Sequence, residues 1–309
     1  MMKKKITVIG SGNVGAQCAY RLAQRNIADV VLLDIIEGVP QGKALDMAQA
    51  GSIDGFNAAV VGTNNYAETA DSDVVVITAG LARKPGMSRD DLITKNASII
   101  KNVIDAAVKH SPYAVLIMVT NPLDVMTYYA LKISGFPKNR VVGMAPLLDA
   151  ARLALFISQA TNVPLDKVHA EVLGSHGDLM VPVPRLSTAN GQPIAELLSP
   201  EKIKQIIART TDGGAEIVNL LKTGSAYYAP GSAAARMAAA VVNDTKEIIN
   251  SCCYLDGEYG LAGVCLGVPA KLGQKGIEEI VKIELSAEEK AALSHAAGAV
   301  KSLFPLLAL

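Results

Sequence analysis

Short apolar runs alternate with amphipathic stretches through the first half of the chain. The runs are rich in Val and Ile and occupy residues 5–10, 29–34, 73–80, 113–122 and 139–145. Runs without polar alternation are typical of strands buried on both faces, as in a parallel sheet. Between two of them, Val14, Cys18 and Leu22 recur every fourth residue, which indicates a helix. This alternation of strand and helix predicts a Rossmann-type, doubly wound α/β domain with a parallel sheet.

The pattern changes after residue 143. Helical periodicity covers residues 149–160, 200–222 and 231–250, and short strand candidates occupy residues 252–260, 264–273 and 280–285. Asp256-Gly257 is typical of a hairpin turn, and Ser286 with Glu289 forms a capping box that predicts the start of a last helix. We therefore predict two domains, a Rossmann domain at residues 1–143 and a C-terminal mixed α+β domain at residues 144–309.

Charge and composition restrict the partners of the chain. Half of the 309 residues are apolar, and 29 basic residues balance 29 acidic ones. A chain without net charge has no overall field that gathers nucleic acid or an anionic membrane surface. The N-terminal apolar run ends after four residues, and no apolar stretch approaches the ~20 residues of a membrane span. We therefore expect a soluble, cytoplasmic protein with no nucleic-acid partner and no membrane partner.

The cysteines do not form a recognisable metal or disulfide pattern. Cys18, Cys252, Cys253 and Cys265 make neither a CxxC motif nor a ligand spacing with the four histidines. We expect reduced, mostly buried thiols and no metal site. A redox-active pair of Cys252 and Cys253 is the alternative.

A glycine motif indicates a dinucleotide site. Residues 10–15, GSGNVG, match GxGxxG between a predicted strand and a predicted helix, and Asp34 ends the next strand. The glycines allow a tight turn, close approach of a pyrophosphate and tight helix–strand packing, while Asp34 suits ribose hydroxyls and repels a 2′-phosphate. NAD is therefore favoured over NADP, and a glycine turn without a ligand is the alternative. The candidate residues are Gly10, Ser11, Gly12, Asn13, Val14, Gly15 and Asp34.

Polar residues elsewhere point to catalysis. His176 lies in a glycine-flanked loop, and Asp149 and Arg152 are three residues apart on one face of a predicted helix. Asn121 follows a buried strand, where the ligand crevice of a parallel sheet lies. The alternatives are a structural histidine, an intrahelical salt bridge and a turn residue.

Two arginines flank a Lys-Pro-Gly turn directly after another buried strand. Arg83 and Arg89 are six residues apart in ARKPGMSRDD. Such a loop can carry two cations over a bound anion and close as a lid. Two solvated surface arginines are the alternative.

These segments together resemble the lactate/malate dehydrogenase superfamily, and within it the bacterial malate dehydrogenases built like lactate dehydrogenase. The resemblance rests on GSGNVG, LLDIIEGVPQGKALD, ARKPGMSRDDL, VTNPLD, LDAAR, GSHGD and LLKTGSAYYAP, and it spans essentially the whole chain. It implies reversible hydride transfer between (S)-malate and NAD+, a reaction of the tricarboxylic acid cycle, with oxaloacetate and NADH as products. It also implies that the first domain binds NAD, that the second holds the dicarboxylate substrate, and that the chain forms a homotetramer, with a homodimer as alternative.

The resemblance implies a role for each candidate. His176 gives or takes the proton, and Asp149 is its carboxylate partner. Arg152 grips the substrate carboxylate beside the reacting carbon, Arg89 polarises the carbonyl, and Arg83 distinguishes malate from lactate enzymes. Asn121 touches nicotinamide and substrate, and the further cofactor contacts are Asn96, Val119 and Thr120.

The chain departs from the family at four positions. Pro146-Leu147 stands where relatives usually have Gly-Val, and Pro146 restricts Ala145 to extended backbone, which shifts the expected helix start before Asp149. Ser175 replaces a usual Gly, and Leu179 replaces a common Thr. Two other functions stay open: a lactate-type 2-hydroxyacid dehydrogenase, and a nucleotide-binding regulatory or structural protein that has lost catalysis.

Overall fold

A parallel sheet forms the first half of the protein. The computed structural model describes residues 4–81, 88–307 and 309. The strands are β1 (Lys5–Ile9), β2 (Asp29–Leu33), β3 (Val60–Thr63), β4 (Val74–Ile77), β5 (Val115–Met118) and β6 (Val141–Gly143). They pair in parallel in the order β3-β2-β1-β4-β5-β6, so the strand order reverses between β1 and β4. This is the predicted doubly wound fold, and the reversal is where such sheets bind ligands.

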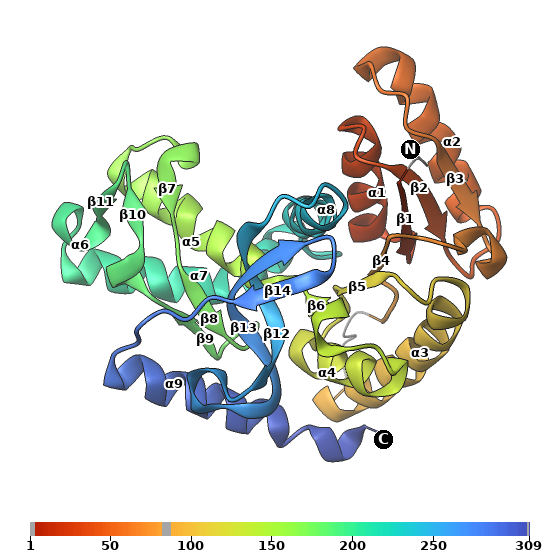
Figure 1. Cartoon of the computed structure of the whole chain (residues 1–309). Helices are drawn as coiled ribbons and strands as arrows, with labels where there is room; N and C mark the ends of the chain where they lie inside the picture. Colours follow the sequence, from red (N-terminus) through yellow and green to blue (C-terminus); the bar gives the residue numbers. More distant parts are fainter. Residues whose placement is uncertain (1–3, 82–87, 308) are drawn as a thin grey trace.

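Helices connect the parallel strands. They are α1 (Asn13–Gln24), α2 (Val39–Asp54), α3 (Arg89–His110) and α4 (Leu123–Ser134). Figure 1 shows α1 and α2 beside β1–β3, and α3 and α4 together beside β5 and β6. Strands β1, β2, β4, β5 and β6 are almost fully buried, because each apolar run is covered on both faces, whereas Val61 of the edge strand β3 is exposed.

The second half continues the same sheet with antiparallel strands. Its helices are α5 (Ala145–Thr161), α6 (Ile194–Leu197), α7 (Pro200–Leu221), α8 (Tyr228–Val242) and α9 (Ala287–Lys301). Its strands are β8 (Val172–Gly174), β9 (Met180–Pro182), β12 (Glu247–Asp256), β13 (Ala262–Gly273) and β14 (Gly276–Ile280), with a separate small sheet of β7 (Val168–His169), β10 (Thr188–Ala189) and β11 (Gln192–Pro193). Short 3-10 helices are η1 (Tyr66–Thr69), η2 (Lys138–Arg140), η3 (Leu165–Lys167), η4 (Pro184–Leu186), η5 (Glu258–Gly260) and η6 (Phe304–Leu306).

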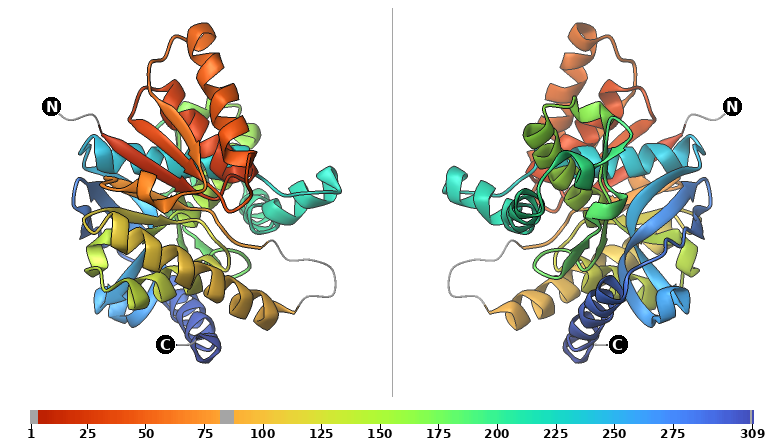
Figure 2. Two further views of the ribbon diagram at one scale, coloured as in Figure 1. Left: turned by 90° about the vertical axis from the view of Figure 1, so that its right-hand side faces the viewer. Right: turned by 90° about the vertical axis from the view of Figure 1, so that its left-hand side faces the viewer.

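The two halves share structure instead of standing apart. β12 pairs antiparallel with β6 at Cys252 and Gly143, so one sheet runs from β3 to β9. Helix α8 from the second half packs on α1 from the first, and a Cβ on Gly231 would lie 2.8 Å from the side chain of Gln17. In both views of Figure 2, α9 lies at the end of the molecule away from α2. The division into domains at residues 143 and 144 stays a prediction.

Three of the expected elements are placed differently. The strand expected at residues 252–260 is β12 (Glu247–Asp256), and η5 (Glu258–Gly260) follows it. The helix expected at residues 231–250 ends at Val242, because Asp244 and Lys246 adopt left-handed backbone and the chain then pairs with β13 as β12. The strand expected at residues 280–285 lies earlier, as β14, because the turn at Gly276 sets its register against β13. By contrast, Ser286 caps α9 with Glu289 as predicted.

The four cysteines lie in the interior of the protein. All four cysteines are free and buried, and burial raises the pKa of Cys18 to about 12. Burial also raises the pKa values of Cys252 and Cys253 well above the usual range, which disfavours a reactive pair. Within the described residues, no helix has the length and apolar character needed to cross a membrane.

Candidate active site

The glycine turn after β1 is shaped by close contacts. Gly10 has a φ of 104°, and a Cβ there would lie 2.6 Å from Thr78 Oγ1. A Cβ on Gly15 would lie 1.8 Å from the carbonyl oxygen of Gly10, so α1 packs directly on the turn. Gly12 is the N-cap of α1, exposed Asn13 begins the helix, and no described atom lies within 4 Å of a Cβ on Gly12. The turn is therefore tight on its protein side and open at Gly12, which fits a pyrophosphate.

Asp34 lies beside this turn, directly after β2. Its Oδ2 accepts hydrogen bonds from Ser11 N at 2.6 Å and from Ser11 Oγ at 2.8 Å. Partial burial would raise the pKa of Asp34, but the bonds from Ser11 and from the backbone of Ile36 outweigh burial and lower it. The carboxylate is therefore charged at neutral pH, as an acceptor for ribose hydroxyls should be. Lys43 Nζ also reaches the turn and donates to the carbonyl of Ser11 at 2.6 Å.

Two other predicted cofactor residues hold the edge of the sheet together. Asn96 is fully buried in α3, where its Oδ1 accepts from Leu81 N at 2.8 Å and its Nδ2 donates to the carbonyl of Asn121 at 2.7 Å. Thr120 Oγ1 donates to the carbonyl of Ala79 at 2.6 Å. These bonds join the segments that follow β4 and β5. Asn96 and Thr120 thus brace the ligand edge, and their direct contact with a cofactor stays a prediction.

A cleft lies where the two halves meet at this edge. The predicted residues that line it are Val14, Val119, Asn121, Arg152 and His176. Residues that were not predicted complete it, among them Thr211, Asp212 and Gly214 of α7 and Ser225 of the following loop. The glycine turn leads into the cleft through Val14, because this residue lies in the first turn of α1.

His176, which lines the cleft, forms an ion pair with the buried Asp149. The ring Nδ1 of His176 lies 2.9 Å from Asp149 Oδ2 and 3.1 Å from Oδ1, and the side chain of Asp149 is 2 % exposed. Burial alone would lower the pKa of His176, but the charge and hydrogen bond of Asp149 and the charge of Asp124 outweigh burial and raise it. Nδ1 is thus engaged, and Nε2 is the nitrogen left for a substrate.

Arg152 shares the same carboxylate. Its Nη1 lies 3.2 Å from Asp149 Oδ1, so the i,i+3 salt bridge expected as the structural alternative is present beside His176. Arg152 Nε is buried, and the described residues offer it no hydrogen-bond acceptor. The side chain of Arg152 packs on two glycines of α7. A Cβ on Gly213 would lie 3.2 Å from Arg152 Cδ, and a Cβ on Gly214 would lie 3.4 Å from Arg152 Nη2. An orphaned buried donor in a cleft is suited to an incoming carboxylate.

Arg89 does not line the cleft in the structure. Arg89 is the first residue of α3 and is exposed, directly after the N-cap Ser88. Arg83 lies outside the described residues. The assignment of both arginines to the substrate therefore stays a prediction.

The departures from the family pattern are accommodated locally. Ala145 is helical, so the expectation of extended backbone before Pro146 was wrong. Pro146 lies in the first turn of α5, where a missing N–H costs no helical bond, and its ring packs on Gly267, where a Cβ would lie 2.8 Å from Pro146 Cγ. Leu179 packs against the core, and Ser175 is buried.

Asp124 was not among the predicted site residues. This carboxylate is 3 % exposed in the first turn of α4, and it accepts hydrogen bonds from Ser175 and from the backbone of His176. Its position in VTNPLD, three residues after Asn121, was the available signal. The Gly-Gly pair at residues 213 and 214 of a helical pattern was a second signal, since glycine is unfavourable there without a packing reason.

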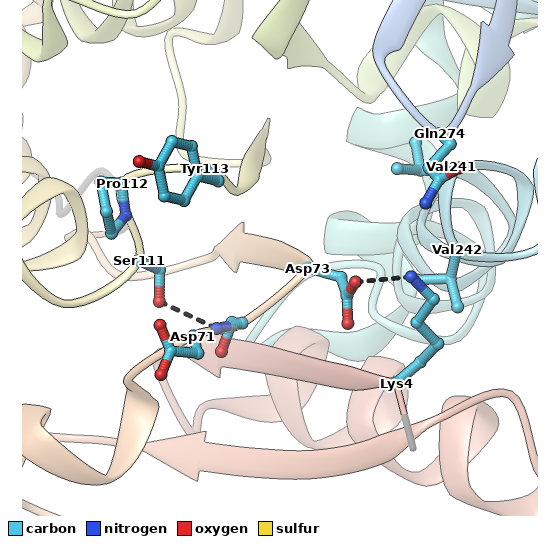
Figure 3. Close-up of a pocket in the computed structure, with 10 residues that line it drawn as sticks. Lys4, Asp71, Asp73, Ser111, Pro112, Tyr113, Val241, Val242 and Gln274 are labelled. Atoms are coloured by element: carbon cyan, nitrogen blue, oxygen red, sulfur yellow. Dashed lines mark hydrogen bonds and ion pairs between the residues drawn. The ribbon is translucent and has the colours of Figure 1, made fainter. Parts of the chain in front are cut away.

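Another hollow lies at the opposite, amino-terminal edge of the parallel strands (Figure 3). Lys4 Nζ and Asp73 Oδ1 face each other there at 2.8 Å, and Tyr113 and Gln274 also line the hollow. None of the described residues that line it is a predicted site residue. The hollow therefore lies away from the cleft that gathers His176.

The chain matches known proteins over almost its full length. A family model described as lactate/malate dehydrogenase, NAD binding domain matches residues 4–143, and one described as lactate/malate dehydrogenase, alpha/beta C-terminal domain matches residues 147–304. A malate dehydrogenase of Chlorobium phaeobacteroides is 54 % identical over 309 residues, which cover 98 % of this chain and 100 % of the relative.

Solved structures give the same result. The malate dehydrogenase of Salinibacter ruber superposes with a TM-score of 0.94 at 49 % identity, covering 98 % of this chain and 97 % of its own. A lactate dehydrogenase of Cryptosporidium parvum, solved with lactic acid and nicotinamide adenine dinucleotide, superposes with a TM-score of 0.96 at 39 % identity, covering 99 % and 98 %. The chain is an NAD-dependent oxidoreductase, and it belongs to the lactate/malate dehydrogenase family.

Proposed function

We propose that the protein is a malate dehydrogenase, which interconverts (S)-malate and oxaloacetate with NAD as the hydride carrier. The observation that carries the proposal is the cluster of His176, Asp149 and Arg152 in a cleft beside the glycine turn. The bound nicotinamide supplies or accepts the hydride. His176 Nε2 gives a proton to the carbonyl oxygen in oxaloacetate reduction and takes it back in malate oxidation, while Asp149 holds the ring and stabilises its charged form.

Arginines bind the two carboxylates of the substrate in this proposal. Arg152 is a planar, two-pronged partner for the carboxylate beside the reacting carbon, and its unpaired Nε supports this role. Arg83 meets the far carboxylate, and Arg89 faces the carbonyl oxygen on which negative charge develops. Arg89 stands at a helix N-terminus, where the helix dipole disfavours a cation, so the helix itself gives no reason for an arginine there.

The remaining assignments follow from the same proposal. Gly10, Gly12, Gly15 and the intervening residues 11, 13 and 14 hold the pyrophosphate, and Asp34 holds the ribose. Asn121, with the segment from Val119, contacts the nicotinamide, and Asn96 supports it. We infer a cytoplasmic enzyme of the tricarboxylic acid cycle, in which residues 1–143 bind NAD and residues 144–309 bind substrate.

We also infer a homotetramer, with a homodimer as the alternative. Exposed apolar side chains on α2, Leu45 at 61 % and Ile53 at 85 %, support an interface on that helix. Sedimentation equilibrium should give the mass of four chains of 32.3 kDa. The mass of one chain would contradict both assemblies.

Steady-state kinetics test the substrate. We expect kcat/KM for oxaloacetate with NADH to exceed that for pyruvate at least about 1000-fold, because pyruvate leaves the cation of Arg83 unpaired. Comparable values for the two ketoacids would instead identify a lactate-type enzyme. No NADH oxidation with either would favour a binding protein without catalysis.

The variant Arg83→Gln tests the residue that sets this preference. Losing the cation should lower kcat/KM for oxaloacetate and raise it for pyruvate, so that the ratio falls by about 100-fold or more. Lys84→Gln is the matched control, because it removes a neighbouring charge of the same loop. An unchanged ratio in Arg83→Gln refutes the assignment of Arg83.

A further inference from the structure

A buried carboxylate that the proposed mechanism does not use lies directly behind the catalytic loop. Asp124 Oδ2 accepts hydrogen bonds from Ser175 Oγ at 2.8 Å and from His176 N at 3.0 Å. Its Oδ1 accepts one from Cys252 Sγ at 3.2 Å. The three donors come from the loop after β8 and from β12, whereas Asp124 itself belongs to α4. One carboxylate therefore joins three separate segments behind His176.

The charge of Asp124 needs an explanation that hydrogen bonding alone does not give. Among the described residues, no lysine or arginine forms an ion pair with it, although it is 3 % exposed. Burying a carboxylate without a cation is costly, and an asparagine would accept the same bonds from Ser175 and from the backbone of His176 at lower cost. Burial raises the pKa of Asp124, and the hydrogen bonds from Ser175 and Cys252 and the charge of protonated His176 oppose that effect.

The surroundings of His176 are electrostatically mixed. Asp149 and Arg152 face it from α5, and Asp124 faces it from α4. Asp178 lies two residues further along the same loop, and Asp212 of α7 lines the same cleft. Arg152 disfavours the protonated ring, whereas Asp149 and Asp124 favour it. Asp149 also forms an ion pair with Arg152, so the positive charge of Arg152 partly offsets the negative charge that Asp149 presents to the ring. Asp124 forms no ion pair with a lysine or arginine among the described residues, so no such partner offsets its charge beside the ring.

We propose that Asp124 is a positioning residue for His176: it fixes the backbone at this residue, as Asp149 fixes the ring, and its negative charge favours the protonated imidazole. The proposal rests on the function assigned to His176 above. Asp124 is also close in sequence to the proposed nicotinamide contact, because Asn121 lies three residues before it, in the turn that leads into α4. A single short turn thereby carries a cleft residue at one end and the support of the catalytic loop at the other.

The variant Asp124→Asn separates charge from shape. Asparagine keeps the size and one acceptor oxygen but loses the negative charge. Asp105→Asn is the matched control, because it removes an exposed carboxylate of α3 that pairs only with Lys101 among the described residues. For each protein we would measure the rate at which diethylpyrocarbonate modifies His176 against pH, by peptide mass spectrometry. NADH binding and the pH profile of kcat/KM for oxaloacetate would be measured in parallel.

We expect the modification midpoint of His176 to fall by about one pH unit in Asp124→Asn and to stay in place in Asp105→Asn. In Asp124→Asn, kcat/KM for oxaloacetate should then be roughly tenfold lower than in the wild type at pH values above the wild-type midpoint. It should change much less at pH values below the midpoint of the variant. The Kd for NADH should stay within about twofold of the wild type, since the glycine turn is untouched. A purely structural role would lower kcat/KM equally at every pH and leave the midpoint in place, which would overturn the proposal.

A second variant covers the case in which Asp124→Asn does not fold. Ser175→Ala keeps the charge and removes one of the two loop bonds, so kcat/KM should fall about three- to tenfold at every pH with an unchanged midpoint. Wild-type turnover in Ser175→Ala would contradict the positioning role. Because the modification midpoint needs no turnover, it tests Asp124 even if the protein fails to reduce oxaloacetate, a failure that would count against the proposed function alone.

Discussion

At the scale of single residues, burial and two carboxylates have opposite effects on the pKa of His176. Burial favours the neutral ring, but Asp149 and Asp124 outweigh it, so the pKa of His176 is raised above its usual range. Oxaloacetate reduction needs the protonated ring. Its kcat/KM should therefore be flat below that pKa and fall about tenfold per pH unit above it, while malate oxidation should show the opposite dependence.

Measuring kcat/KM in both directions from about pH 6 to 9 would check this dependence. His176→Asn should lose about 100-fold or more in kcat and lose the pH dependence with it. Profiles that bend in the same sense in both directions would rule out a single proton passed by His176.

A second residue-scale prediction concerns the glycine that faces Arg152. A Cβ on Gly213 would lie 3.2 Å from Arg152 Cδ, so Gly213→Ala should displace the guanidinium by a few tenths of an ångström. KM for oxaloacetate should rise about three- to tenfold, because a shifted partner loses its two-pronged geometry. The free energy of unfolding should not fall, since alanine gains up to about 1 kcal/mol over glycine inside a helix.

Gly298→Ala is the control for this substitution. Gly298 lies in α9, and a Cβ there meets no described atom within 4 Å. It should gain the same helical stability with an unchanged KM. Equal KM values in all three proteins would show that Gly213 does not position Arg152.

At the scale of elements, two glycines of the turn and of α1 differ in the space that they leave for a side chain. Gly15→Ala places a Cβ 1.8 Å from the carbonyl oxygen of Gly10, so it should destabilise the fold by at least about 1–3 kcal/mol and weaken NADH binding. Gly12→Ala meets no described atom, so it should leave stability within about 1 kcal/mol of the wild type while weakening NADH binding about tenfold or more. Urea unfolding and NADH fluorescence titration measure the two effects. Normal NADH binding by Gly12→Ala would contradict a pyrophosphate at this turn.

The strands of the parallel sheet could be predicted from the sequence, whereas one helix end and one site residue could not. The Val- and Ile-rich runs gave β1, β2, β4, β5 and β6 correctly, because strands buried on both faces carry no polar alternation. The end of α8 at Val242 could not be predicted, because the following residues have helical periodicity and join β12 only through pairing with β13. Asp124 was missed for a similar reason: its three partners lie 51, 52 and 128 residues away in the chain.

At the scale of the whole molecule, a ligand held between the two halves should stabilise both. One sheet runs through the protein, and α8 of the second half packs on α1, the helix that opens the dinucleotide turn. NADH at 100 times its Kd should therefore add about 2.7 kcal/mol to the free energy of unfolding and raise Tm by about 3 to 6 °C. NADPH at the same concentration should raise it by less than about 1 °C, because the charged Asp34 repels a 2′-phosphate. Differential scanning calorimetry at fixed protein concentration gives both values, and Asp34→Ser should bring the two shifts closer together. Equal shifts for the two cofactors in the wild type would mean that Asp34 does not select between them.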